Sequence, residues 1–260
     1  EEVLMSRIHV LKFGSSVLQS SGDIASVAAE IRRYRAGGLP VIAVVSAFSG
    51  ETDRRIAEAE SLGLDPQTPD YACLIAGGEI ESAHALAAHL DDAGTPAQCL
   101  LPQDFSLRAD GPRLDAVPVS LDRQGLHRAV EGCPVLIVPG YAGIDAQGET
   151  VLLGRGGSDL SALFIASELG QPECRLIKDV DGLYDRDPNR HAEARRYETV
   201  STRTAYQVGG VLVQRKAVSF AEFRTLTIHV TSAGVNHGTR IYPNAPDKFH
   251  EAKIAQALTA

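Results

Sequence analysis

Two uninterrupted apolar segments constrain the fold of this chain more than any other feature of its sequence. Residues 40–46 read P-V-I-A-V-V-S and residues 134–138 read P-V-L-I-V. A short apolar run without polar alternation is typical of a strand that is covered on both faces. Strands of this kind belong to parallel sheets with helices on either side, so the sequence predicts an α/β fold.

Segments with helical spacing alternate with further strands. In residues 22–35, Ile24, Val27 and Ile31 fall on one helical face, and Asp23 is placed to cap its start. The expected architecture is a three-layer α/β/α sandwich with a mainly parallel central sheet and two lobes. Strands are expected at 7–12, 40–46, 96–101, 134–138, 150–153, 174–179 and, as the last one, 225–230. Helices are expected at 22–35, 52–62, 71–90, 122–131, 154–169, 200–208 and 213–223, with short edge strands and loops over 101–121.

The composition argues against several classes of partner and location. The chain has 33 acidic and 25 basic residues and a formal net charge of −8, so we expect no nucleic-acid partner. No run of about 18 apolar residues occurs, and the first residues lack the basic start of a signal peptide, so no membrane segment is expected. The four cysteines form no C-x-x-C pair, which is typical of reduced thiols in a cytoplasmic protein.

Three strand-to-helix junctions carry unusual residues, and ligands of open α/β sheets bind at the carboxyl ends of strands. The first junction reads Lys12-Phe13-Gly14-Ser15-Ser16, in a chain with only five lysines. Small residues let backbone amides approach an anion, and the Lys12 ammonium could neutralise a phosphoryl group. The spacing is not that of a P-loop, and an ordinary tight turn is the alternative.

The second junction is G-R-G-G-S-D at residues 154–159, which opens an apolar helix. Its glycines leave backbone amides bare at a helix N-terminus, where the helix dipole favours anions. Arg155 could fork onto a carboxylate. The alternative is a turn in which Ser158 or Asp159 simply caps the helix.

The third junction is K-D-V-D-G-L-Y-D-R-D-P at residues 178–188, which leaves a buried strand and turns at Gly182. Tyr184 could lie against a flat base. The acidic spacing does not match a calcium loop, and a solvated acidic loop is the alternative. Two further groups, Ser46 with Thr52 and the G-G-E at residues 77–79, also carry polar residues in apolar surroundings. Glu79 would need a cationic partner if buried, or else lies on a helix surface.

Together and in this order, these motifs resemble the amino-acid kinase family, and within it the catalytic domain of aspartokinases, over about residues 7–241. The resemblance implies a catalytic domain at 5–241, with an acceptor lobe at about 5–145, a nucleotide lobe at about 146–241 and a tail at 242–260. Regulatory ACT domains, which commonly follow, are not expected. The chain would then be a stand-alone form, a subunit or a piece of a fusion.

The resemblance also implies residue roles. Lys12 would contact the transferred phosphoryl group, and Asp159 would orient Lys12. The phosphates would be bound by Gly14, Ser15, Ser16, Gly156, Gly157 and Ser158. The acceptor would be held by Ser46, Thr52, Glu79 and Arg155. The nucleoside would be contacted by Lys178, Asp179, Tyr184 and Lys216.

The implied reaction is ATP-dependent phosphorylation of an amino-acid carboxylate, with L-aspartate giving 4-phospho-L-aspartate as the first expectation. Magnesium ion, Mg2+, would be held mainly by the ATP phosphates, without a metal site built from side chains. A kinase for a different small carboxylate and a catalytically weak nucleotide-binding module stay open as alternatives. Family members are usually dimers or larger, so a homodimer or higher homo-oligomer is expected.

Three positions depart from the aspartokinase pattern. Lys178 stands where Thr is usual, Asn189 where Arg is expected, and Val211 where the common K-V-L-H-P segment has its Lys. Lys216 or Lys178 would have to replace that lost ammonium group. In addition, the sequence from Lys12 to Leu18 looks more like a glutamate 5-kinase, whereas G-R-G-G-S-D does not.

Overall fold

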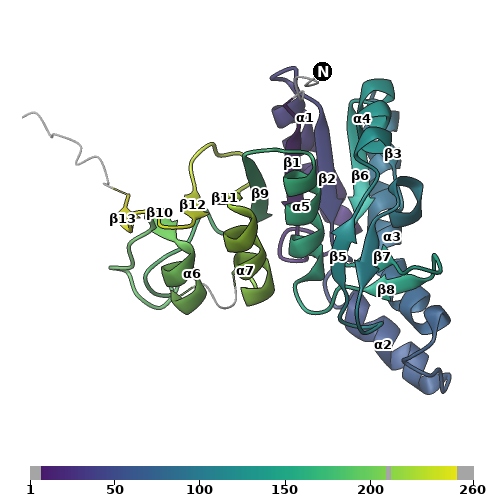
Figure 1. The fold of residues 1–260 in the computed structure, drawn as a ribbon. Helices are drawn as coiled ribbons and strands as arrows, with labels where there is room; N and C mark the ends of the chain where they lie inside the picture. Colours follow the sequence, from purple (N-terminus) through teal and green to yellow (C-terminus); the bar gives the residue numbers. More distant parts are fainter. Residues whose placement is uncertain (1–6, 209–211, 251–260) are drawn as a thin grey trace, which may run out of the picture.

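A nine-stranded, mainly parallel sheet forms the centre of the molecule (Figure 1). The computed structural model describes residues 7–208 and 212–250. The strand order is β13-β10-β12-β11-β9-β1-β2-β6-β3, and only the pairs β11–β12 and β10–β13 are antiparallel. The bounds are β1 His9–Phe13, β2 Val41–Val45, β3 Gln98–Cys99, β6 Val135–Pro139, β9 Glu173–Lys178, β10 Tyr197–Ser201, β11 Thr227–Ser232, β12 Thr239–Tyr242 and β13 Lys248–Phe249.

Helices cover both faces of this sheet, as the apolar runs predict. All five residues of β2 are buried, and they alternate between two cores. Ile42 and Val44 pack with Phe164 on one side, whereas Val41, Ala43 and Val45 pack on the other. The first side is covered by α4 Arg123–Gly132, α5 Gly157–Glu168, α6 Thr202–Val208 and α7 Arg215–Arg224, the second by α1 Ile24–Arg35 and α3 Pro69–Asp92. The three-layer α/β/α expectation is confirmed.

A second, four-stranded sheet lies beside α2 and α3 at the lower right of Figure 1. Its order is β5-β4-β7-β8, with β4 Arg108–Asp110, β5 Val117–Ser120, β7 Ala142–Ile144 and β8 Thr150–Leu152. The sequence predicts short strands within 101–121 and at 150–153, but not their common sheet or β7. The remaining elements are η1 Ser21–Asp23, α2 Glu51–Ser61 and η2 Pro102–Phe105.

The expectation that the strand at 225–230 is the last one is wrong. β12 and β13 follow it, and β10 precedes α6, in a segment expected to be loop and helix. Part of the expected tail at 242–260 therefore belongs to the sheet: Asp247 accepts a hydrogen bond from the Ser201 amide at 2.9 Å. These outer strands are short and half exposed, so they lack the apolar runs that reveal buried strands. Within the described residues, no helix is long and apolar enough to cross a membrane.

Candidate active site

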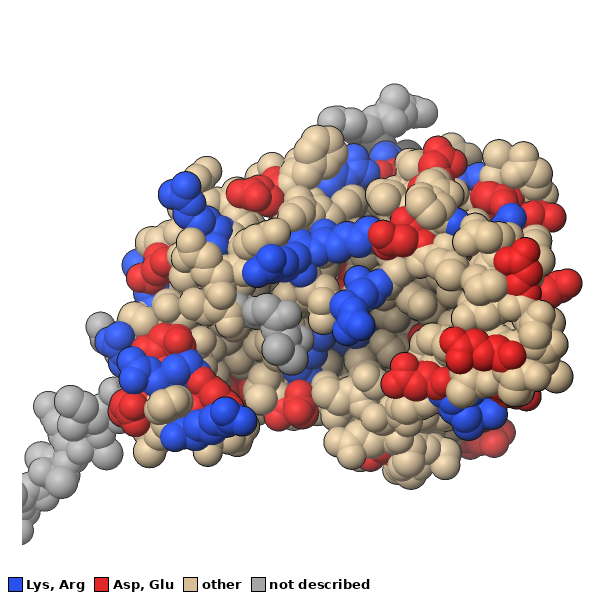
Figure 2. Space-filling model, turned by 90° about the horizontal axis from the view of Figure 1, so that it is seen from below, with Lys and Arg blue, Asp and Glu red and all other residues tan. Residues whose placement is uncertain are grey.

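One cavity of about 1270 Å³ lies where β1, β2 and β9 end at their carboxyl ends. Both ends of the cavity are lined by residues that the sequence singles out, from Ser46 and Glu79 to Asp179 and Tyr184. Figure 2 views the molecule from this side: Lys and Arg side chains gather near the middle of the face, and many Asp and Glu side chains lie to the right. The middle of this face is therefore suited to an anion.

The centre of the cavity holds one carboxylate between two ammonium groups. Lys12 Nζ lies 2.6 Å from Asp159 Oδ1, and Lys178 Nζ lies 3.3 Å from Asp159 Oδ2. Lys12 is on β1 and Lys178 ends the adjacent strand β9, so the parallel pairing brings their ends together. Lys12 and Asp159 are only 5% and 3% exposed. The group carries one positive charge in excess and lines the cavity, so it is placed to attract an anion.

The ionisation of this group follows from its surroundings. Burial alone would raise the pKa of Asp159, but the charges of Lys12 and Lys178 outweigh burial and hold that pKa below its usual value. Burial and the neighbouring Lys12 charge lower the pKa of Lys178, although Asp159 opposes them. Asp159 therefore stays a carboxylate and keeps the two ammonium groups together.

Glycines make room for this arrangement. A Cβ on Gly14 would lie 2.8 Å from Lys12 Nζ, so any other residue would displace the ammonium group from its present position. Gly156 has φ +78° at the start of α5, and a Cβ there would also lie 2.5 Å from Gln214 Cβ. The first turn of α5 thus presents its backbone amides beside Asp159, where the helix dipole favours an anion. Gly14, Ser15, Ser16, Gly156, Gly157 and Ser158 all line the cavity.

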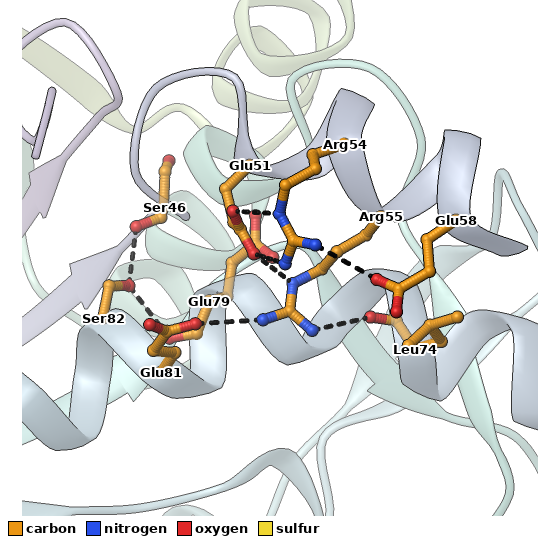
Figure 3. Close-up of polar contacts among 9 residues, drawn as sticks. All are labelled: Ser46, Glu51, Arg54, Arg55, Glu58, Leu74, Glu79, Glu81 and Ser82. Atoms are coloured by element: carbon orange, nitrogen blue, oxygen red, sulfur yellow. Dashed lines mark hydrogen bonds and ion pairs between the residues drawn. The ribbon is translucent and has the colours of Figure 1, made fainter.

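The acceptor residues expected from the sequence lie at one end of the cavity. Ser46, Thr52, Glu79 and Arg155 all line it. Arg155 is exposed, and none of the hydrogen bonds or ion pairs found among the described residues involves it, so its guanidinium group is free for a ligand. Ser82 Oγ donates to the Ser46 carbonyl at 2.7 Å and ties that loop to α3 (Figure 3).

Glu79 is buried, which excludes the helix-surface alternative. It is 3% exposed, and its Oε2 has no hydrogen-bond partner among the described residues. Burial raises the pKa of Glu79 to about 7, although the Ala47 amide and the charges of Arg55 and Lys12 oppose the shift. A carboxyl group with this pKa is half ionised near neutral pH, and a bound cation would complete its ionisation.

The end of the cavity beyond Lys178 contains Asp179 and Tyr184. Tyr184 Oη donates a hydrogen bond to Asp181 Oδ1 at 2.8 Å, which holds the ring in place. Asn189 also lines this end. Val211, the position of the lost lysine, lies outside the described residues.

Lys216 is not brought to this cavity. Its Nζ contacts Asp115 Oδ1 at 2.8 Å, the Leu153 carbonyl at 2.9 Å and the Ala116 carbonyl at 3.1 Å. The ammonium group therefore connects α7 to the small sheet. The expected contact of Lys216 with the nucleotide does not fit this position. Lys178 is instead the second ammonium group at the cavity.

Several cavity residues were missed by sequence reasoning. Tyr141 and Leu114 also line the cavity, and Gln214 lies against Gly156. Tyr141 follows Pro139-Gly140 at the end of β6, so the rule that located the other junctions could have found it. Leu114 and Gln214 lie in irregular segments without such a signal.

The chain resembles known proteins over most of its length. The model of the amino acid kinase family matches residues 7–232. The chain belongs to the amino acid kinase family. This kinase-family chain is 32% identical to the aspartate kinase Ask_LysC of Stutzerimonas stutzeri over 215 residues. The match covers 82% of this chain and 52% of that protein. It therefore spans about half the length of the curated relatives it matches.

Solved structures of the amino acid kinase family share the fold. The aspartate kinase of Synechocystis superposes with a TM-score of 0.77 at 27% identity, over 94% of this chain and 42% of that one. The UMP kinase of Bacillus anthracis gives a TM-score of 0.66 at 17% identity, over 94% of this chain and 98% of that one. The second similarity concerns the fold alone, because proteins with one fold can differ in substrate.

Proposed function

We propose that this chain transfers the γ-phosphoryl group of ATP to a carboxylate of an amino acid, with L-aspartate as the acceptor and 4-phospho-L-aspartate as the product. The observation that carries the proposal is the Lys12–Asp159–Lys178 group, which lines the same cavity as Arg155, Glu79 and Tyr184. A cationic centre between an amino-acid site and a base site suits phosphoryl transfer between two bound ligands. The similarity to aspartate kinases supports the choice of acceptor.

The transfer needs no nucleophile from the protein. One acceptor carboxylate oxygen attacks the γ-phosphorus, the bond from that phosphorus to the β,γ-bridging oxygen breaks, and ADP leaves with the electron pair. Lys12 and Lys178 neutralise charge on the oxygens of the transferring group, and Asp159 holds both ammonium groups in place. The amides of Gly156 and Ser158, with the Gly14–Ser16 turn, bind the phosphates, whereas the Gly157 amide already donates to the Gly154 carbonyl.

The two ends of the cavity would hold the two substrates. Arg155 binds the α-carboxylate of the acceptor as a bidentate pair, and Glu79 accepts its ammonium group. Ser46 and Thr52 supply hydroxyl groups on the same side, whereas Asp179 and Tyr184 contact the nucleoside.

Mg2+ would enter with ATP. The described residues contain no cluster of three or more side chains placed to ligate a metal. The exposed Asp179 carboxylate lines the cavity and fits an ion whose ligands are mostly phosphate oxygens and water. When bound, the ion supplies charge neutralisation at the phosphates. The homodimer or higher oligomer stays an expectation from the family resemblance, to be checked by light scattering.

An acceptor screen tests the proposal. ADP release is measured with magnesium ATP and each amino acid, and hydroxylamine is added to trap an acyl phosphate as its hydroxamate. Turnover and hydroxamate with aspartate support the proposed reaction. Turnover only with another carboxylate would show that aspartate is not the acceptor. ATP binding without any turnover would show that the chain is a nucleotide-binding module and not a kinase.

A further inference from the structure

The two helices beside the acceptor end meet at a notch in α3. Residues 77 and 78 are both glycine, in the interior of a 24-residue helix. Glycine in a helix interior costs stability relative to alanine. Neither glycine caps the helix, so the cost needs another explanation.

Arg55 of α2 occupies this notch. A Cβ on Gly77 would lie 2.7 Å from Arg55 Nη1, and a Cβ on Gly78 would lie 2.8 Å from Ala47 Cβ and 3.1 Å from Glu51 Cγ. The two glycines therefore allow α2 and the loop before it to approach α3 more closely than any other residue type would. The two glycines therefore serve the contact between α2 and α3, and not the formation of α3 itself.

The Arg55 guanidinium group joins the two helices from within the notch. It is only 15% exposed, and its Nε lies 2.8 Å from Glu51 Oε1 on the same helix. Its Nη2 lies 3.0 Å from Glu81 Oε2 of α3, and Nη1 lies 3.4 Å from the Leu74 carbonyl of α3 (Figure 3). The planar group therefore donates hydrogen bonds to α3 through Nη1 and Nη2, whereas its contact with Glu51 through Nε is an ion pair without a hydrogen bond.

Arg54, the neighbouring residue, makes a contrast within the same helix. It also pairs with Glu51, at 2.6 Å, and with Glu58 at 3.2 Å, but its side chain is 58% exposed and its partners among the described residues are all on α2 (Figure 3). Arg54 and Arg55 thus carry the same charge and share one carboxylate. Only Arg55 reaches α3.

The position of this contact connects it to the acceptor. Thr52 lies three residues before Arg55, one turn earlier on α2, and Glu79 follows Gly78 directly on α3. Both line the cavity. Any slip of α2 along α3 would therefore change the distance between Thr52 and Glu79.

We infer that Arg55, seated on Gly77 and Gly78, is a positioning residue that sets the spacing of Thr52 and Glu79 around the acceptor. The inference rests on the proposed function for its acceptor, but not for the contact between the helices. Arg55 does not touch the acceptor in this account. It acts through the register of α2 on α3, so its loss should affect the acceptor and not ATP.

The test compares Arg55→Leu with the matched control Arg54→Leu in the whole chain. Arg55→Leu is expected to raise the acceptor KM about tenfold while kcat and the KM of ATP change less than about twofold, and Arg54→Leu to leave all three unchanged. Arg55→Lys, which cannot serve three acceptors in the same geometry, is expected to fall between Arg55→Leu and the unmodified chain. Equal effects of Arg54→Leu and Arg55→Leu would overturn the inference.

The notch provides a second, independent variant. Gly77→Ala adds a methyl group at the Arg55 Nη1 position and should raise the acceptor KM in the same way. Because both changes break one contact, the double variant should be no worse than Arg55→Leu alone. Additive effects of the two substitutions would contradict a shared contact. If Arg55→Leu does not fold, Gly77→Ala alone tests the inference, and an unchanged acceptor KM in that variant would overturn it.

Amide hydrogen exchange separates this inference from the proposed function. Residues 50–56 should exchange faster in Arg55→Leu than in Arg54→Leu, whatever the acceptor. If the chain phosphorylates no carboxylate, the proposed function fails but the exchange difference still supports the positioning contact. If exchange is the same in the two variants, the positioning role is wrong even in an active kinase.

Discussion

Lys178 places a second ammonium group beside Asp159, at a position where the resemblance to aspartokinases leads us to expect Thr. Lys178→Met should lower kcat by about 100-fold, since one of two charges facing the transferring phosphoryl group is lost. Lys216→Met removes the same charge from a group bound to Asp115 and two carbonyls outside the cavity. That control should lower the thermal midpoint but keep kcat within about twofold. Similar kcat losses in both variants would contradict the assignment of Lys178 to the phosphates.

Glu79 makes a pH prediction at the same scale. Its pKa is raised by burial to about 7, with Arg55, Lys12 and the Ala47 amide opposing the shift and Tyr141 nearby. An acceptor ammonium group needs the carboxylate, so acceptor affinity should rise with pH, about tenfold per pH unit below 7, and level off above it. The KM of ATP should not follow this profile. Glu79→Gln should remove the pH dependence of the acceptor KM; an unchanged profile in that variant would assign the titration elsewhere.

The raised pKa of Glu79 also makes the stability of the folded chain depend on pH. A carboxyl group whose pKa is higher in the folded chain binds more protons there than in the unfolded chain between about pH 4.5 and 7. The free energy of unfolding contributed by Glu79 therefore falls as pH rises through this range. Urea unfolding of Glu79→Gln should show a smaller loss of stability between pH 5 and pH 8 than the unmodified chain, and an equal loss would contradict the burial of this group as the cause.

At the scale of elements, the start of α5 is the part that tolerates least change. Gly156→Ala forces alanine into φ +78° and places Cβ 2.5 Å from Gln214 Cβ, so we expect a loss of about 2–4 kcal/mol in the free energy of unfolding and a higher KM for ATP. Gly148→Ala is the matched control, because Gly148 has φ +84° but nothing within 4 Å of the added Cβ. It should lose only about 1 kcal/mol and keep the KM of ATP. Urea titration and steady-state kinetics of both variants measure the difference.

The elements also mark what sequence reasoning can and cannot find. The buried strands β2 and β6 and the long helices are evident from their apolar patterns, and the junctions after β1 and β9 follow from the strand-end rule. The outer strands β10, β12 and β13 carry no such pattern, because each is short and partly exposed. The sequence shows Gly77 and Gly78 only as part of a motif with Glu79. Their role in packing depends on Arg55, which lies 22 positions before Gly77 in the chain but next to it in space.

At the scale of the whole molecule, the site is assembled from segments that are distant in sequence. Lys12, Glu79, Asp159 and Tyr184 line one cavity. Parallel pairing aligns the carboxyl ends of β1, β2 and β9 there, and the helices α3 and α5 contribute Glu79 and Asp159. The sequence predicts that these junctions lie at one edge of a sheet, but not which side chains touch. Lys216 illustrates this: its place near the motif in sequence suggested the nucleotide, whereas three oxygen acceptors hold it elsewhere.

This assembly predicts that the two ligands can be separated by one substitution. Arg155 is exposed at the acceptor end and takes part in none of the bonds found among the described residues, so Arg155→Ala should cost the fold little. A ligand that binds only the folded chain raises the thermal midpoint by mass action. A nonhydrolysable ATP analogue should therefore raise the midpoint of Arg155→Ala as much as that of the unmodified chain, whereas aspartate should raise only the latter. In kinetics the same variant should raise the acceptor KM at least about tenfold, because a bidentate carboxylate contact is lost. If the analogue ceases to stabilise Arg155→Ala while aspartate still does, Arg155 binds phosphate instead, and the acceptor and nucleotide ends of the cavity must be assigned anew.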